Sequence, residues 1–123
     1  MSHKDLALWQ TSLNLIEKVY ALTGLFPAHE LHGITNQIRR ASVSILCNIS
    51  EGAGRNSMND YIRFPRISQG SLAEVEALSI ISNRLGYLAT VDFLEMQEKI
   101  NRINSQLTGL IRYLRNVQTK KAN

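Results

Sequence analysis

Residues 37–76 decide the fold, and they read QIRRASVSILCNISEGAGRNSMNDYIRFPRISQGSLAEVE. Counted in helical steps, the first part of this stretch and the residues just before it have one apolar face: Ile34, Ile38, Ala41, Ile45 and Ile49. The neighbouring face is polar: Gln37, Arg40, Ser44, Asn48 and Glu51. A helix that carries both faces either lines a polar network inside a helical bundle or presents a binding site.

The polar face should continue onto the next helix. A buried arginine requires an acidic partner, because an unpaired charge in a protein interior is costly. We therefore predict an ion pair between Arg40 and either Glu74 or Glu51. The whole predicted network, which would fix the register of the two helices, comprises Gln37, Arg40, Ser44, Asn48, Glu51, Ser71 and Glu74.

Apolar periodicity over the rest of the chain predicts four helices, at residues 5–24, 29–50, 57–86 and 90–117, with a basic tail at residues 118–123. Glycines follow three of these helices, and no segment alternates with the period of two that is typical of strands. The expected fold is all-α: a single domain over residues 1–123 that forms an up-down-up-down antiparallel four-helix bundle with short loops.

Two of the helices carry more apolar residues than one buried seam requires. The first helix is expected to bury Leu6, Trp9, Leu13, Ile16 and Tyr20, and the fourth a heptad seam of Phe93, Met96, Ile100, Ile103, Leu107, Leu110, Leu114 and Val117. Off these seams lie Leu8, Leu15 and Leu22 on the first helix, and Leu94, Ile111 and Tyr113 on the fourth. A second apolar face usually packs against another subunit, so we expect a homo-oligomer.

Pro65 interrupts the third predicted helix. Proline removes a backbone hydrogen bond and clashes with the preceding turn. We expect a kink near residues 61–66, or a helix that begins properly only after the proline.

Composition narrows the class of protein. Cys47 is the only cysteine, which excludes an internal disulfide and favours a reducing compartment. No apolar run approaches the ~20 residues that cross a bilayer, and the first residues lack the pattern of a signal peptide. We expect a cytoplasmic protein with no membrane partner.

Positive charge is concentrated at the end of the sequence. The chain has a net charge of +4, but residues 99–123 hold six basic residues and no acidic one, which leaves −2 on residues 1–98. Such a segment is either a solvated helix face or a surface that meets phosphates. The candidate nucleic-acid-binding residues are Lys99, Arg102, Arg112, Arg115, Lys120 and Lys121, together with Arg55 of the glycine-rich segment 52–57.

Other motifs carry less chemistry. The glycine-rich segment follows a helix rather than a strand, so it is expected to stop one helix and cap the next at Ser57. His29, Glu30 and His32 lack the spacing of a metal site, and no nucleophile has an evident base. We expect no metal, no cofactor and no catalysis.

The order of three motifs resembles a known family. NQIRRASVSILCNISEG at 36–52 is followed by GRNSMNDYIRF at 54–64 and GSLAEVE at 70–76, and the opening DLALWQTSLNLIEKVYALTGLFPAHE at 5–30 also fits. Together they resemble the four-helix-bundle family first noticed in intervening sequences of bacterial 23S rRNA genes, which is related to accessory proteins of diversity-generating retroelements. The resemblance implies a ring-shaped assembly, a pentamer, that associates with RNA or a ribonucleoprotein.

Three functional hypotheses follow. The leading one is a non-enzymatic, oligomeric helical bundle that binds structured RNA or a ribonucleoprotein through its basic surface. The alternative is a structural or protein-interaction module with no role in nucleic-acid binding. A third hypothesis, an enzyme, would place its chemistry among Arg40, Asn48, Glu51 and Glu74, and it requires a solvent-open cleft there.

Overall fold

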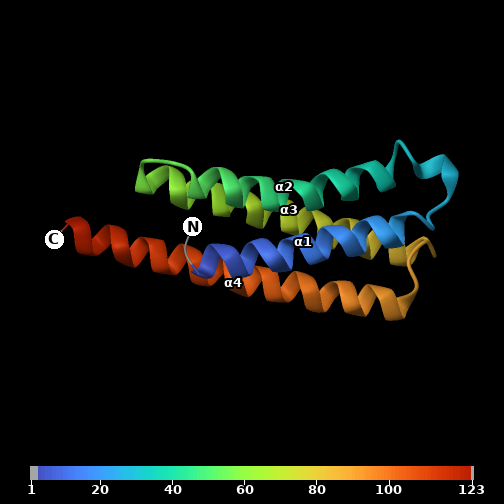
Figure 1. Cartoon of the computed structure of the whole chain (residues 1–123). Helices are drawn as coiled ribbons and strands as arrows, with labels where there is room; N and C mark the ends of the chain where they lie inside the picture. Colours follow the sequence, from blue (N-terminus) through green and yellow to red (C-terminus); the bar gives the residue numbers. More distant parts are fainter. Residues whose placement is uncertain (1–2, 123) are drawn as a thin grey trace.

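The structure is a computed structural model that describes residues 3–122. Over this part of the chain it contains four α-helices, one short 3-10 helix and no strand: α1 His3–Thr23, η1 Ala28–Glu30, α2 Ile34–Ala53, α3 Met58–Arg84 and α4 Thr90–Ala122. The predicted all-α class is confirmed. The α1–α2 and α3–α4 connections lie at one end of the molecule, and the short α2–α3 connection and the C-terminus lie at the other (Figure 1).

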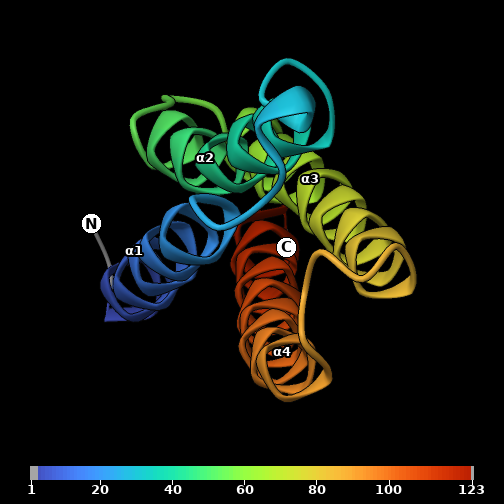
Figure 2. The same ribbon diagram turned by 90° about the vertical axis from the view of Figure 1, so that its right-hand side faces the viewer.

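The helices pack around one core. α1 contacts α2 and α4, and α3 contacts the same two helices, with the α2–α3 contact the most extensive. Figure 2, which views the molecule along its length, shows the four helices arranged around a common centre. The core side chains come from every helix, and Leu15, Ile45, Val75, Ile103 and Leu107 are fully buried. Each such side chain contributes about 1.5–3 kcal/mol relative to an exposed one.

α1 is rotated relative to the sequence prediction. Its buried apolar residues are Leu8, Leu15 and Val19, whereas Leu6 and Tyr20 of the predicted seam are 55% and 45% exposed. The prediction was wrong because α1 has apolar residues on two faces, and periodicity alone does not say which face meets the core. The surface of α1 therefore carries a partly exposed apolar stripe.

α2 buries the apolar face that the sequence predicted, from Ile34 to Ile49. The helix begins at residue 34 rather than 29, because the preceding residues form η1 and a turn that ends at Gly33. Glu30 in η1 accepts a hydrogen bond of 3.0 Å from the hydroxyl of Tyr87, which lies in the α3–α4 connection. This contact joins the two connections at the same end of the molecule.

α3 runs through Pro65 without a break, so the alternative in which the helix begins after the proline is wrong. Its start agrees with the sequence: the Ser57 side chain accepts a 3.1 Å hydrogen bond from the backbone N–H of Asp60. Pro65 is buried and faces the end of α2. A Cβ on Gly52 would lie 3.3 Å from the Pro65 Cδ and 2.9 Å from the Phe64 Cβ, so glycine permits this close approach.

α4 confirms most of the predicted heptad seam. Met96, Ile100, Ile103, Leu107, Leu110 and Leu114 are all buried, and Ile111, expected off the seam, is buried too. The helix extends to Ala122, so the predicted basic tail is wrong for residues 118–122; residue 123 lies outside the described part. Lys120 and Lys121 occupy the last turn, where positive charge interacts favourably with the helix dipole.

Candidate nucleic-acid interface

The predicted polar network is only partly formed. Arg40 and Glu74 are both exposed, and no ion pair joins them within residues 3–121. Glu51 is also exposed and pairs instead with Arg55, at 2.5 Å between Oε1 and Nη2. The predicted buried Arg40 ion pair is therefore wrong. Arg40 is exposed instead, and an arginine in contact with water does not require a carboxylate partner.

The hydroxyl and amide members of the network do meet. The Ser44 and Ser71 hydroxyl oxygens lie 2.9 Å apart and join α2 to α3. The Asn48 side-chain amide donates to the Ser44 hydroxyl at 3.0 Å and to its carbonyl at 2.8 Å. Ser44 and Ser71 also line an open pocket of about 350 Å³, and the exposed residues around it are Asn36, Gln37, Arg40 and Glu74, which form its rim. The rim thus carries one positive and one negative charge.

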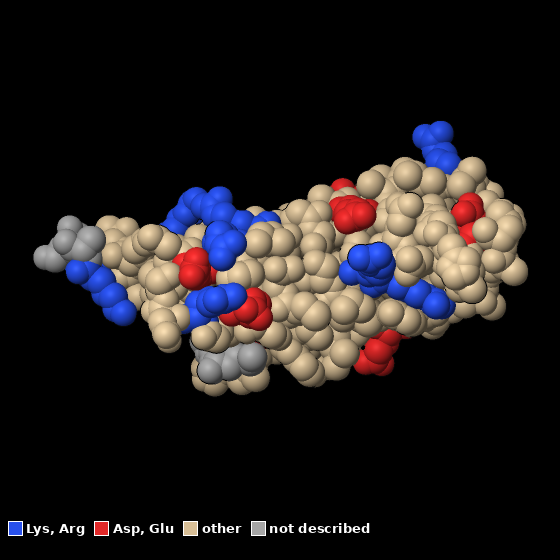
Figure 3. Space-filling view, turned by 90° about the horizontal axis from the view of Figure 1, so that it is seen from above, with Lys and Arg blue, Asp and Glu red and all other residues tan. Residues whose placement is uncertain are grey.

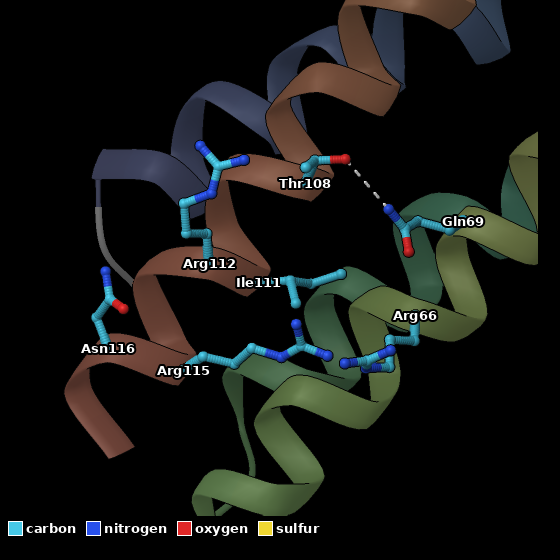
Figure 4. Close-up of a pocket in the computed structure, with 7 residues that line it drawn as sticks. All are labelled: Arg66, Gln69, Thr108, Ile111, Arg112, Arg115 and Asn116. Carbon is cyan, nitrogen blue, oxygen red and sulfur yellow. Dashed lines mark hydrogen bonds between the residues drawn. The ribbon is translucent and has the colours of Figure 1, made fainter. Parts of the chain in front are cut away.

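A second and more strongly charged pocket lies between α3 and α4. It has a volume of about 450 Å³ and is lined by Arg66, Gln69, Thr108, Ile111, Arg112, Arg115 and Asn116. Figure 4 shows the Arg66 and Arg115 side chains reaching toward each other from α3 and α4. Gln69 donates a hydrogen bond to Thr108 at 3.4 Å and links the two helices at one end of the pocket.

This arginine pocket has an unbalanced charge. Its lining contains three arginines and no acidic residue. All three arginines are exposed, and none forms an ion pair with any described acidic side chain. The guanidinium groups of Arg66 and Arg115, which reach toward each other, repel, and an anion placed between them relieves the repulsion. Their planar N–H donors match the oxygens of a phosphate or a carboxylate.

The structure brings together two of the seven candidate residues from the sequence, Arg112 and Arg115. The other five lie outside the arginine pocket. Arg55 is held by Glu51 and lies over the Phe64 ring, at 4.9 Å from its centroid. Lys99, which is half-buried, and Arg102, which is exposed, lie earlier in α4 than the pocket. Lys120 and Lys121 are exposed at the end of this helix.

Arg66 is the residue that sequence reasoning missed. Six of the seven predicted basic residues come from the last 25 positions, where the charge is asymmetric, whereas Arg66 comes from the middle of the chain. A sequence signal existed, because Arg63 and Arg66 lie three residues apart and so share a helix face. Only one of the two remains free, since Arg63 pairs with Asp60 at 3.4 Å.

Basic side chains are unevenly distributed along the length of the molecule. Seen from above, lysine and arginine side chains gather toward the end that carries the C-terminus, with acidic side chains among them (Figure 3). Two ion pairs, Arg55–Glu51 and Arg63–Asp60, account for part of this mixture. The arginine pocket near this end has no such compensation.

A smaller pocket continues along the same α3–α4 seam. It has a volume of about 170 Å³ and is lined by Gln69, Leu72, Ala73, Glu76, Ile100, Asn101 and Asn104. Gln69 borders both pockets. The two pockets therefore form successive parts of one groove, which we call the α3–α4 groove.

The described residues form neither a metal site nor a membrane-spanning helix. Over the described residues, no group of three or more His, Cys, Asp or Glu side chains could hold a metal ion. In the same part of the chain, none of the helices combines the length and the hydropathy that a membrane span requires.

These features define a basic, all-α, four-helix protein with an arginine-lined groove. The chain belongs to the family of 23S rRNA-intervening sequence proteins, whose pattern matches residues 4–109. It is similar to a crystal structure of a protein of unknown function from the S23 ribosomal protein family of Bacteroides thetaiotaomicron, with a TM-score of 0.82 and 23% identity. That similarity covers 89% of this chain and 98% of the other, and it concerns the fold. No curated protein matches the chain.

Proposed function

We propose that this protein is a non-enzymatic, homo-oligomeric helical bundle that binds structured RNA or a ribonucleoprotein through the arginine pocket of the α3–α4 groove. The observation that carries the proposal is the lining itself, three unpaired arginines with no acidic residue. Phosphate contacts from arginine supply much of the affinity of proteins for nucleic acids. The family, whose description refers to 23S rRNA, makes RNA the first polyanion to test.

The proposal includes the arrangement and assembly of the bundle. The position of the connections at alternate ends favours an antiparallel up-down-up-down topology. The outward stripe on α1, with Leu6 and Tyr20 about half exposed, favours burial against another copy. In a ring, which we infer to be a pentamer in the cytoplasm, each copy repeats the arginine pocket, and several weak phosphate contacts would add up.

A protein-interaction module is the second candidate function. It is favoured by exposed apolar side chains near the α1–α2 and α3–α4 connections, where Leu25 and Val91 are 83% and 74% exposed. This hypothesis requires no ligand in the arginine pocket. It predicts a stable complex with another protein, and nucleic acid should not affect the formation of that complex.

The enzymatic hypothesis has less support. The α2–α3 pocket is open, as that hypothesis requires. However, the Ser44 hydroxyl meets the Ser71 hydroxyl and the Asn48 amide, and neither partner is a general base. We therefore propose a binding protein rather than an enzyme.

The test measures RNA affinity as a function of salt for the double variant Arg112→Glu, Arg115→Glu. The RNA is a fluorescently labelled stem-loop, followed by anisotropy. We expect a large loss of affinity and a salt dependence that is shallower by about 1–2 in log–log slope, because two phosphate contacts disappear. The matched control is Arg40→Glu, Arg84→Glu, which changes the net charge equally at exposed arginines outside the groove.

Two results would overturn the proposal. One is unchanged affinity and slope in the Arg112, Arg115 variant; the other is an equal loss in the control, which would indicate a response to net charge alone. Native mass spectrometry of gently purified protein reports the subunit number and any bound RNA together. A bare oligomer would favour the interaction module, and a bare monomer would exclude the assembly.

A further inference from the structure

The two parts of the α3–α4 groove differ in chemistry. The arginine pocket presents three guanidinium groups. The smaller pocket presents one carboxylate, Glu76, and two amides, Asn101 and Asn104, beside the buried side chains of Leu72 and Ile100. One end therefore suits an anion, and the other suits a flat group with hydrogen-bonding edges.

Size and spacing limit what the smaller pocket can hold. Its volume of about 170 Å³ is below the roughly 300–1,000 Å³ of pockets that take drug-sized ligands. From Arg66 to Ala73, the groove advances by seven residues along α3, or about 10 Å at 1.5 Å per residue. That separation is comparable to the reach of one nucleotide from its phosphate to the far edge of its base.

Glu76 gives the smaller pocket its selectivity. It is half-buried, and it pairs with no basic side chain in the described residues. A carboxylate accepts hydrogen bonds and donates none, so it favours a base edge with adjacent N–H groups and disfavours a phosphate. Guanine presents two such donors, N1–H and N2–H, next to the O6 acceptor that an asparagine amide can meet.

We infer that the α3–α4 groove binds one unpaired guanine nucleotide of an RNA, with the phosphate at Arg66 and Arg115 and the base in the pocket of Glu76, Asn101 and Asn104. This inference rests on the proposed RNA-binding function and adds a base preference and a direction to it. The apolar floor of Leu72 and Ile100 contacts the base, and Gln69, which borders both pockets, lies beside the sugar. Unpaired bases in loops and bulges expose the edge that this arrangement needs.

The test compares two labelled stem-loop RNAs that differ in one unpaired loop base, guanine or adenine. With the wild-type chain we expect guanine to be preferred by at least about fivefold, since a good bidentate contact discriminates by that much or more. The variant Glu76→Gln should lose the preference while keeping the salt slope, because the phosphate contacts remain. Inosine, which lacks the 2-amino group, should bind with an intermediate affinity.

Glu74→Gln is the matched control. Glu74 lies two residues away on α3, but it lines the α2–α3 pocket and faces the other seam. This variant should keep the guanine preference. Circular dichroism of both variants checks that each remains folded.

Each outcome decides something. If guanine and adenine bind equally, or if Glu76→Gln and Glu74→Gln behave alike, the base pocket is wrong while RNA binding through the arginines stands. If the wild-type chain binds neither RNA, the proposed function and this inference are both overturned.

Discussion

The two seams of α3, against α2 and against α4, differ in how closely the helices pack and in how their charges are balanced. Against α2, the helix packs so closely that Gly52 leaves no space for a side chain, and the Ser44 and Ser71 hydroxyls meet at 2.9 Å across the seam. Against α4, the seam opens into the two pockets of the α3–α4 groove. Both seams therefore carry an open pocket, but the close helix contact at Gly52 belongs to the α2–α3 seam and the cluster of like charges to the α3–α4 groove.

The two seams also differ in how their polar residues are paired. In the α2–α3 seam, small hydroxyl and amide groups satisfy one another, and the rim charges are of opposite sign. In the α3–α4 groove, arginines of like sign gather with no acidic partner in the lining. Polar groups that satisfy each other hold helices together, whereas unbalanced charges indicate a ligand.

The largest effect is expected at Arg66, the arginine of the α3–α4 groove that the sequence analysis did not indicate. Arg66→Ala should weaken binding of a structured RNA by about tenfold or more, because a hydrogen bond to a charged group contributes about 1.5–3 kcal/mol. Arg40→Ala changes an arginine on the rim of the pocket between α2 and α3, and it should leave the RNA affinity within twofold. Fluorescence anisotropy at fixed salt measures both. Equal effects of the two variants would remove the functional distinction between the seams.

The next prediction tests how closely α2 packs against α3 at Gly52. Gly52→Ala places a Cβ 2.9 Å from the Phe64 Cβ and 3.3 Å from the Tyr61 carbonyl oxygen, which flexible side-chain ends cannot relieve. We expect a loss of about 1–3 kcal/mol in the free energy of unfolding, measured by urea denaturation.

Gly70→Ala is the control for that variant. Beyond the helix's own backbone and the neighbouring residues, nothing lies within 4 Å of a Cβ at this position, which is in the interior of α3. Alanine there should stabilise the protein by about 0.5–1 kcal/mol, because glycine loses more backbone entropy on folding. If Gly52→Ala were as stable as Gly70→Ala, the close approach of α2 and α3 would be wrong.

A smaller effect is expected for the hydrogen bonds that join α2 to α3. Ser68 is fully buried and donates a 2.8 Å hydrogen bond to the Ile45 carbonyl of α2. Ser68→Ala should cost about 0.5–1.5 kcal/mol in unfolding free energy. Ser44→Ala should cost less, because water can reach its half-buried partners. Urea denaturation of the two variants measures both losses. If Ser44→Ala cost more than Ser68→Ala, the hydrogen bond at the pocket would be the more stabilising one.

The smallest expected effect concerns the far end of the α3–α4 side, where Tyr87 joins Glu30. The hydrogen bond to Glu30, followed by burial and the negative charge of that carboxylate, raises the pKa of the Tyr87 phenol above its ordinary value. The neutral phenol is therefore favoured in the folded state. Its contribution to stability is fully present below the unfolded pKa of about 10 and is lost as the pH rises through the higher folded pKa.

Tyr87→Phe should accordingly lower stability at neutral pH, and the difference from the wild type should shrink above pH ~10. Urea denaturation from pH 7 to pH 11 measures this difference. Tyr113→Phe, at an exposed position of α4, is the control and should show no such convergence. A difference that stays constant over the whole range would exclude the Tyr87–Glu30 bond as its source.

How much of the fold was predictable depended on the number of apolar faces on each helix. α4 has one dominant seam, and six of its eight predicted seam residues are buried as expected. α1 has two apolar faces, and the predicted one, with Leu6 and Tyr20, is the outer one. Local periodicity identifies a helix in both cases, but the choice of buried face depends on neighbours that the sequence does not place.

The candidate site was predictable in part for a similar reason. Charge asymmetry along the chain pointed to Arg112 and Arg115, which lie three residues apart on one helix. Arg66 joins them only because α3 and α4 lie side by side, although their residues are far apart in the sequence. The predicted Arg40 ion pair is wrong for a related reason: the sequence shows a polar helix face but not that Arg40, at its edge, is exposed.

By itself, the sequence determined the all-α class, the family and the approximate extent of each helix, because these depend on residue periodicity, on caps such as Ser57 and on local motifs. The packing of the helices decided which face of α1 is buried, that Arg40 is exposed, and that Arg66 and Arg115 line the same pocket. The physical reason is that burial and charge neighbourhood are properties of pairs of helices, and their energies are set only when the helices pack.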